Sequence, residues 1–151
     1  MKMLNKKVLK HNLVEMNPKE LIKFIKHEFP INGQDYHTHA RKVQIIKALS
    51  PSELSSAIAR MEGIKSQYDP SKTWGIGSLI LGTSFIGFQV LFGVNLSKIT
   101  EGNRLNALIY VLITIIICLW TLRNILKDKE NATTADYLKE LLIQIKSEKN
   151  Q

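Results

Sequence analysis

The stretch WGIGSLILGTSFIGFQVLFGV, residues 74–94, contains no charged side chain, and neither does NALIYVLITIIICLWTL, residues 106–122. An α-helix rises about 1.5 Å per residue, so the first stretch extends about 31 Å, close to the bilayer's hydrocarbon thickness of about 30 Å. The second extends about 25 Å, near the short limit, and Leu105 can lengthen it. Both stretches are therefore predicted to be transmembrane helices.

A buried hairpin inside a soluble helical protein is the alternative for these two stretches. A chain of 151 residues has too little other apolar sequence to enclose two helices that are hydrophobic on every side. Trp74 and Trp120 also favour the membrane, because a hairpin brings both indoles to one interface. The predicted fold is all-α: an integral membrane protein with a two-span transmembrane hairpin and cytosolic helices at both ends.

Basic residues predict the orientation. The chain has 21 Lys and Arg against 13 Asp and Glu, a formal net charge of +8, and 13 of the basic residues precede Trp74. The loop, residues 95–105, carries only Lys98 and Arg104 as basic residues. By the positive-inside rule, the predicted localisation is the cell membrane, with both termini in the cytoplasm and the loop outside.

The predicted domains are a cytosolic basic helical region (1–73), the hairpin (74–122) and a cytosolic linker with an amphipathic helix (123–151). Within the first region, Asn17 and Pro18 form a helix start signal, and Pro30 stops that helix. The apolar face of this helix either packs into a small cytosolic core, which is favoured, or lies on the inner leaflet.

Other parts of the N-terminal region show weaker or similar signals. Residues 1–16 form either a basic amphipathic helix with a thin apolar stripe or a disordered basic arm. Further helices are predicted at about residues 35–49 and, after a cap at Ser50, to about Tyr68. Asp69-Pro70-Ser71 then predicts a break before the first span.

The C-terminal tail is predicted to begin with a charged linker at residues 127–131. Thr133 or Thr134 then caps a final helix. An apolar stripe along this helix predicts that it packs on the N-terminal helices or on a second copy of itself. The stripe consists of Tyr137, Leu138, Leu141, Leu142 and Ile145.

Lysines and arginines near the spans are predicted to contact anionic lipid headgroups, each contributing about 1 kcal/mol near the surface. These residues are Lys19, Lys23, Lys26, Lys72, Arg123 and Lys127. A basic surface is also compatible with nucleic acid, but these side chains are spread over several helices without a nucleic-acid motif. The predicted partner is therefore an anionic bilayer, with no nucleic acid expected.

No motif predicts an enzyme, a metal or a cofactor. His37 and His39 are two residues apart, which separates them by about 200° on a helix, so they share no ligand face. Cys118 is the only cysteine, which excludes an intramolecular disulfide, and it is expected to be a small apolar packing residue. The glycines follow no nucleotide-loop pattern, and no carboxylate lies within a span.

Small and polar residues predict helix contacts inside the membrane, because they let helices approach closely in lipid. Span one contributes Gly75, Ser78, Gly82, Gln89 and Gly93, and span two contributes Thr114, Cys118 and Thr121. One alternative, which is favoured, is that they join the two spans of one chain. The other is self-association, with Gln89 facing its copy or lining a narrow polar path.

The predicted function is a non-enzymatic membrane-anchored interaction or assembly module with a cytosolic helical platform. A protein partner or a homo-oligomer is expected through the cytosolic helices. The layout also resembles that of small holin-like and defence-effector proteins. This resemblance implies the alternative, an oligomeric pore-forming or membrane-permeabilising effector.

Overall fold

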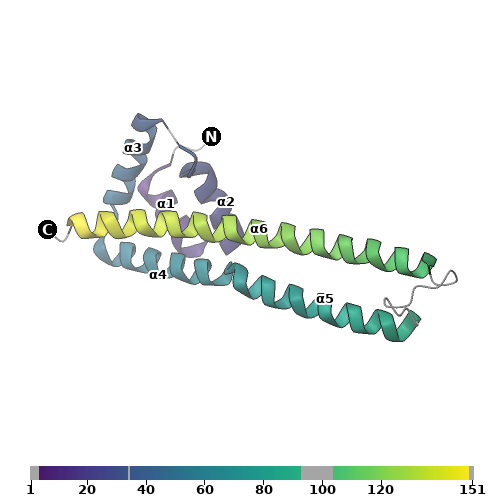
Figure 1. Ribbon diagram of the computed structural model, residues 1–151. Coiled ribbons are helices and arrows are strands. Elements are labelled where there is room, and N and C mark those ends of the chain that lie inside the picture. The colour runs from purple at the N-terminus through teal and green to yellow at the C-terminus, as the bar shows by residue number, and fades with distance from the viewer. Residues whose placement is uncertain (1–3, 34, 93–103, 150–151) are drawn as a thin grey trace. The chain divides into compact units, whose positions relative to one another are not determined.

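The computed structural model describes residues 4–33, 35–92 and 104–149, and their regular structure is entirely α-helical. Figure 1 shows the helices in order: α1 (Lys6–Glu15), α2 (Pro18–Glu28), α3 (Tyr36–Lys47), α4 (Pro51–Gln67), α5 (Pro70–Phe92) and α6 (Arg104–Lys149). The chain divides into two compact units. The core unit comprises Met1–Tyr68 with Glu130–Gln151, and the hairpin unit comprises Asp69–Lys129.

Helix caps explain where the helices of the core unit begin. The side chain of Asn17 accepts a hydrogen bond from Lys19 N at 3.0 Å, which starts α2. Ser50 and Glu53 form a complete capping box at α4: Ser50 N donates to Glu53 Oε2 at 2.8 Å, and Glu53 N donates to Ser50 Oγ at 3.2 Å. Both starts confirm predicted positions.

Residues 6–15 form a helix, which decides between the two alternatives for the N-terminal segment. The side chain of Asn5 accepts from Val8 N at 2.9 Å and caps α1. Leu9 and Leu13 are buried on its inner face. The thin apolar stripe is sufficient because α1 packs against α3 and α4 instead of standing alone.

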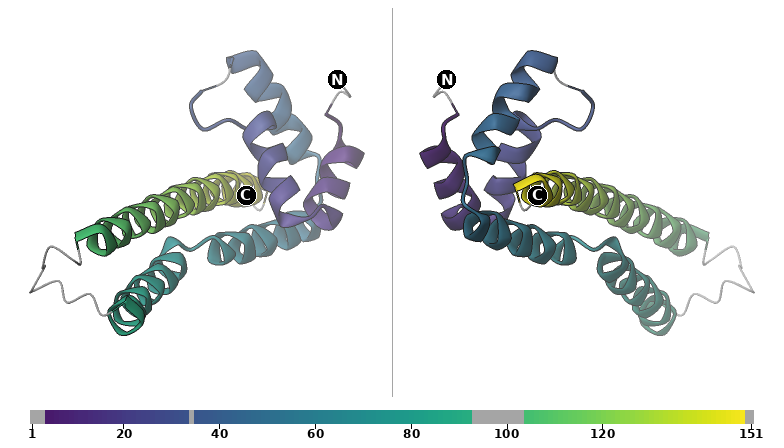
Figure 2. Two further views of the ribbon diagram at one scale, coloured as in Figure 1. Left: turned by 90° about the vertical axis from the view of Figure 1, so that its right-hand side faces the viewer. Right: turned by 90° about the vertical axis from the view of Figure 1, so that its left-hand side faces the viewer.

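One hydrophobic cluster holds the core unit together, and α1, α2, α3, α4 and the C-terminal part of α6 all contribute to it. Figure 2 shows these helices from two further sides. The apolar face of α2 lies in this core, with Leu21 and Ile25 fully buried, so the packed alternative for α2 is confirmed. Each fully buried aliphatic side chain contributes about 1.5–3 kcal/mol. The buried members are Leu9, Leu13, Leu21, Ile22, Ile25, Phe29, Ile46, Leu49, Leu54, Ala57, Met61, Ile64, Ala135, Leu138, Leu142 and Ile145.

The structure differs from the prediction at residues 127–134, where a linker and a helix cap were expected. α6 continues through this segment without interruption. Thr134 does not cap, because its hydroxyl donates to Glu130 O at 2.8 Å, inside the helix. The segment contains neither Pro nor Gly, so its charged and small residues are compatible with a helix that tertiary packing stabilises.

The predicted break before the first span is present. α4 ends at Gln67 and α5 begins at Pro70, and Ser71 N donates to Asp69 Oδ1 at 2.9 Å. In the hairpin unit, α5 and the N-terminal part of α6 run side by side in opposite directions (Figures 1 and 2). α5, which contains the first predicted span, starts at Pro70, four residues before Trp74.

Candidate functional site

α5 and α6 approach each other closely at Gly77 in the hairpin unit. A Cβ atom added to Gly77 would lie 2.5 Å from Thr121 Cγ2, far inside normal contact distance. Thr121 is 6% exposed, and its hydroxyl donates to Ile117 O at 2.8 Å. Gly77 is therefore a position where the two helices require a residue without a side chain.

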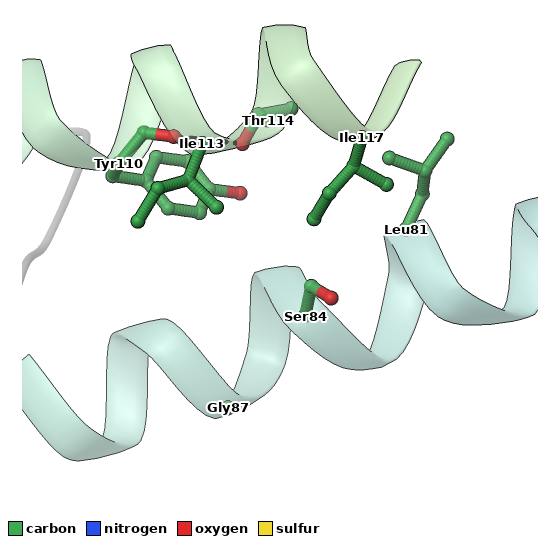
Figure 3. A pocket seen from close by; sticks show the side chains of 7 residues that line it. All are labelled: Leu81, Ser84, Gly87, Tyr110, Ile113, Thr114 and Ile117. Atoms are coloured by element: carbon green, nitrogen blue, oxygen red, sulfur yellow. Dashed lines mark hydrogen bonds between the residues drawn. The ribbon is translucent and has the colours of Figure 1, made fainter. Parts of the chain in front are cut away.

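A cavity of about 270 Å³ lies farther along the same seam. Figure 3 shows α5 and α6 facing each other across it, with the Ser84 and Tyr110 side chains directed into the space between them. The lining residues are Leu81, Ser84, Gly87, Tyr110, Ile113, Thr114 and Ile117. The small residues of α5 leave this space open because Gly87 has no side chain and Ser84 has a short one.

Threonine hydroxyls in the hairpin unit bond within their own helices. Thr114 donates to Tyr110 O and Thr83 donates to Leu79 O, both at 2.9 Å. Such bonds satisfy a hydroxyl in surroundings that offer no water. At Gly77 the two helices therefore meet through small side chains.

The predicted small and polar stripe is only partly at this seam. Thr121 is buried and Thr114 lines the cavity, while Cys118 is half-buried. The α5 members Gly75, Ser78 and Gly82 are exposed, and an added Cβ at Gly75 or Gly82 would meet nothing within 4 Å. The Gln89 side chain and Gly93 lie outside the described residues, so contacts there stay predictions.

Sequence reasoning missed the α5 residues that do face α6, namely Gly77, Ser84 and Gly87. A signal for them exists in the sequence, because they recur at steps of seven and three. Two small-residue stripes therefore run along α5, and hydrophobicity does not distinguish them because both are flanked by large apolar residues. Only the packed hairpin shows which stripe faces α6.

The apolar surface of the hairpin unit is largely exposed. Ile116 of α6 is 64% exposed and Leu79 of α5 is 68% exposed. Within the described residues, one helix is long and apolar enough to cross a membrane, and it is α6. Trp74 and Trp120 are 62% and 61% exposed on the two helices. Exposed apolar side chains of this kind, flanked by exposed tryptophans, are expected where lipid replaces water as solvent.

Ion pairs connect α6 to the other helices of the core unit. Lys26 Nζ lies 2.8 Å from the Glu130 carboxylate, and Lys139 Nζ lies 2.9 Å from that of Glu62. These pairs border the apolar stripe predicted for the tail. Within that stripe Leu138, Leu142 and Ile145 are buried, and Tyr137 and Leu141 pack against the core.

The pKa of several carboxyl groups in the core unit is lowered by basic neighbours. A hydrogen bond from Lys10 and one from Ser50 N hold the pKa of Glu53 at about 2. Lys65 and then Lys139 lower the pKa of Asp136. These carboxylates stay ionised at neutral pH and serve in caps and ion pairs.

An ion pair between buried Lys42 and half-buried Glu28 joins α3 to α2. Lys42 Nζ is 2.9 Å from Glu28 Oε2 and 5.8 Å from the centre of the Phe29 ring. Burial alone raises the pKa of Glu28, but the hydrogen bonds from Lys42 and His27 outweigh it, so the net pKa is lowered. This pair ties α3 to the end of α2 and accounts for a lysine that is only 9% exposed.

The residues predicted to contact lipid headgroups belong to both units. Lys26 is engaged with Glu130 and Asn131 in the core unit. Lys19 and Lys23 of α2 are exposed, as are Lys72, Arg123 and Lys127 of the hairpin unit. The structure thus brings Arg123 and Lys127 onto consecutive turns of α6, and their contact with lipid stays a prediction.

The histidines lie at the surface of the core unit. His27 is within 3.1 Å of Glu28 and His11 within 3.1 Å of Glu15, while the ring of His37 meets the edge of Tyr36. Across the described ranges, no three His, Cys, Asp or Glu side chains gather in an arrangement that holds a metal ion.

These features define a class: a small all-α membrane protein that combines an apolar helix with a separately packed helical unit. The chain belongs to the family described as YomK prophage membrane protein, which matches residues 7–147. It is 97% identical over 148 residues to the SPbeta prophage-derived protein YomK of Bacillus subtilis (strain 168), covering 98% of this chain and 100% of that protein. No solved structure matches the chain. The all-α fold and the membrane location predicted from the sequence are confirmed at this level.

Proposed function

We propose that this prophage-derived protein is a non-enzymatic membrane-anchored interaction module, with the core unit as a cytosolic helical platform at the inner leaflet. The observation that carries the proposal is the shared core of that unit. Residues before the apolar stretches, such as Leu21, and residues after them, such as Leu138, are buried in one cluster. The platform is therefore closed by both ends of the chain.

This shared core bears on the number of membrane crossings. Segments that pack in one core lie on the same side of a membrane, so the chain between Ile64 and Ala135 crosses an even number of times. If the apolar part of α6 crosses once, another segment crosses back. α5 has 23 residues, Pro70–Phe92, and a helix of that length extends about 35 Å, enough for a span. This supports the two-span arrangement with cytoplasmic termini.

The proposed role is an interaction because the perturbed titratable groups have structural tasks. Glu53 completes a helix cap, and Glu28 pairs with Lys42 between helices. Perturbed groups at a catalytic site instead converge on a cavity that admits a substrate. The charged surface of the core unit is what it offers to a protein partner or to a second copy.

An oligomeric pore-forming or membrane-permeabilising effector is the second candidate. One observation favours it: Gly75, Ser78 and Gly82 of α5 are exposed in the single chain. Small residues on a lipid-facing helix permit close approach by another helix. On this candidate, Gln89 would complete the contact between copies.

Reconstitution of the full chain in dye-loaded vesicles tests the choice. The anchored module predicts no dye release above that of empty vesicles, and a monomer or dimer in nanodiscs. Photo-crosslinkers at exposed positions of the core unit, such as Ser56 and Gln44, should give discrete adducts in cells. Removal of residues 70–129 should abolish these adducts if membrane anchoring is required.

The pore-forming effector predicts a different result in the same vesicles. Release of dye by larger oligomers, lost in Gln89→Leu and kept in Gln144→Leu, would replace the anchored module with the pore-forming effector. Gln144 is an exposed glutamine of the core unit and serves as the matched control.

A further inference from the structure

We infer that one end of the hairpin unit binds anionic phospholipid headgroups through Lys72, Arg123 and Lys127, which we term the basic collar. The inference rests on the proposed membrane-anchored function and names the lipid class that this anchor selects. All three side chains are exposed, and all three belong to the hairpin unit.

The contact between Gly77 and Thr121 sets the level of α5 against α6. At about 1.5 Å per residue, Lys72 lies about 7–8 Å beyond this contact along α5. On the antiparallel α6, Arg123 lies about 3 Å and Lys127 about 9 Å beyond it in the same direction. The basic collar therefore occupies one band, about 6 Å deep, across two neighbouring helices.

Two tryptophans lie close to this band: Trp74 falls inside it, and Trp120 lies just beyond its apolar side. By the same geometry, Trp74 and Trp120 lie within about 6 Å of each other along the hairpin, on either side of the Gly77 level. Both indoles are exposed. Exposed Trp side chains settle at the headgroup level of a bilayer, with apolar residues on the side toward the hydrocarbon. The basic collar thus lies where phosphate groups are expected.

The neighbouring acidic groups leave the collar net positive. Asp69 accepts from Ser71 N at the start of α5, and Lys72 contributes to lowering its pKa. Asp128 on α6 is half-buried. Four cations, Lys129 included, therefore stand against two carboxylates between residues 69–74 and 120–129. A surface of this charge is complementary to phosphatidylglycerol and similar lipids, and each Lys or Arg near an anionic surface strengthens binding about fivefold.

Leu126 shows why the occupant is a lipid and not a soluble acidic protein. Its side chain is 67% exposed between Arg123 and Lys127. An apolar side chain among cations suits the mixed region of headgroups and upper acyl chains. Lys and Arg side chains reach toward phosphate from such positions while their stems cover apolar surface.

The test measures which lipids stay with the protein in nanodiscs formed from mixed phosphatidylcholine and phosphatidylglycerol. The wild-type chain should retain phosphatidylglycerol severalfold above its share in the bulk mixture. The variant K72Q/R123Q/K127Q should lose this enrichment, and high salt should weaken it in the wild type. The charge-preserving variant K72R/R123K/K127R should keep it.

A matched control removes three charges elsewhere. Lys6, Lys7 and Arg41 are exposed residues of the core unit that were not predicted to contact lipid, so K6Q/K7Q/R41Q equals the collar variant in net charge. It should keep the enrichment. Equal loss in both triple variants, or no enrichment in an inserted wild type, overturns the inference. If the wild type is removed from membranes by alkaline carbonate, the anchored function itself fails.

Discussion

Gly77 and Thr121 make a close contact between α5 and α6, and a substitution at Gly77 tests this part of the seam. We expect Gly77→Ala to destabilise the hairpin unit by about 1–3 kcal/mol, because the new methyl group overlaps Thr121 Cγ2. Gly82→Ala is the control, since the space around Gly82 is open. It should be neutral or slightly stabilising. Unfolding in detergent, followed by circular dichroism, measures both.

A second substitution at the same contact should restore the stability that Gly77→Ala loses. Thr121→Ser removes Cγ2 and keeps the hydroxyl that donates to Ile117 O. Combined with Gly77→Ala, it should recover most of the lost stability, giving a coupling energy of about 1 kcal/mol or more. Equal stabilities of Gly77→Ala and Gly82→Ala, or additive effects in the double mutant, would show that the two helices do not meet there.

Glu53 gives the core unit an acid-dependent stability. Its pKa of about 2 in the folded chain is below the ordinary value of 4.5, so its contribution is present above pH 4.5. It is lost as the pH falls toward 2. Glu53→Gln retains the capping-box pattern but has no charge to pair with Lys10. Thermal midpoints measured from pH 6 to pH 2.5 should converge for the two proteins at low pH; a constant difference would refute the assignment.

At the scale of the helix, the sequence predicted where most helices start, but it did not predict that α6 continues through residues 127–134. Asn17, Ser50 and Asp69-Pro70 are local signals with local causes, so their positions could be predicted without the fold. The continuity of α6 depends on packing along Ala135–Ile145, which a cluster of charges and threonines at residues 127–134 conceals. The seam of α5 was missed for a related reason, because two small-residue stripes are equivalent until a partner helix selects one.

Proline at position 132 distinguishes a continuous α6 from a linker. Inside a helix, Ala132→Pro removes a backbone hydrogen bond and clashes with the preceding turn, which costs about 3 kcal/mol or more. Just before a helix that starts at Thr133 or Thr134, proline is tolerated. Ala132→Gly controls for flexibility and should cost about 1 kcal/mol. If Ala132→Pro costs little stability, the helix is interrupted at this segment, as the sequence predicted.

The tail of α6 supplies fully buried side chains to the core unit, as the N-terminal helices do. Leu138 is 1% exposed, so Leu138→Ala should destabilise the core unit by about 2–5 kcal/mol. Ile143 is 40% exposed on the same helix, and Ile143→Ala should cost about 1 kcal/mol or less. Denaturant unfolding of the two variants measures the difference, and similar losses would mean that the tail packs elsewhere.

The whole molecule is organised by the fact that its two ends share one core while the middle is apolar. Family membership establishes a prophage membrane protein. The packing of Leu138 with the N-terminal helices supports the proposed even number of crossings. Composition and the positive-inside rule predict the same sidedness independently. The platform, the hairpin and the basic collar all depend on this topology.

Cysteine labelling of intact cells tests that topology most directly. Single cysteines are placed at Ser56, Ser97 and Ser147 in a Cys118→Ser background, and a membrane-impermeant maleimide is added from outside. The account predicts labelling at position 97 alone, with all three positions labelled after permeabilisation. Labelling of position 56 or 147 in intact cells, or protection of position 97, would contradict a two-span protein with both termini in the cytoplasm.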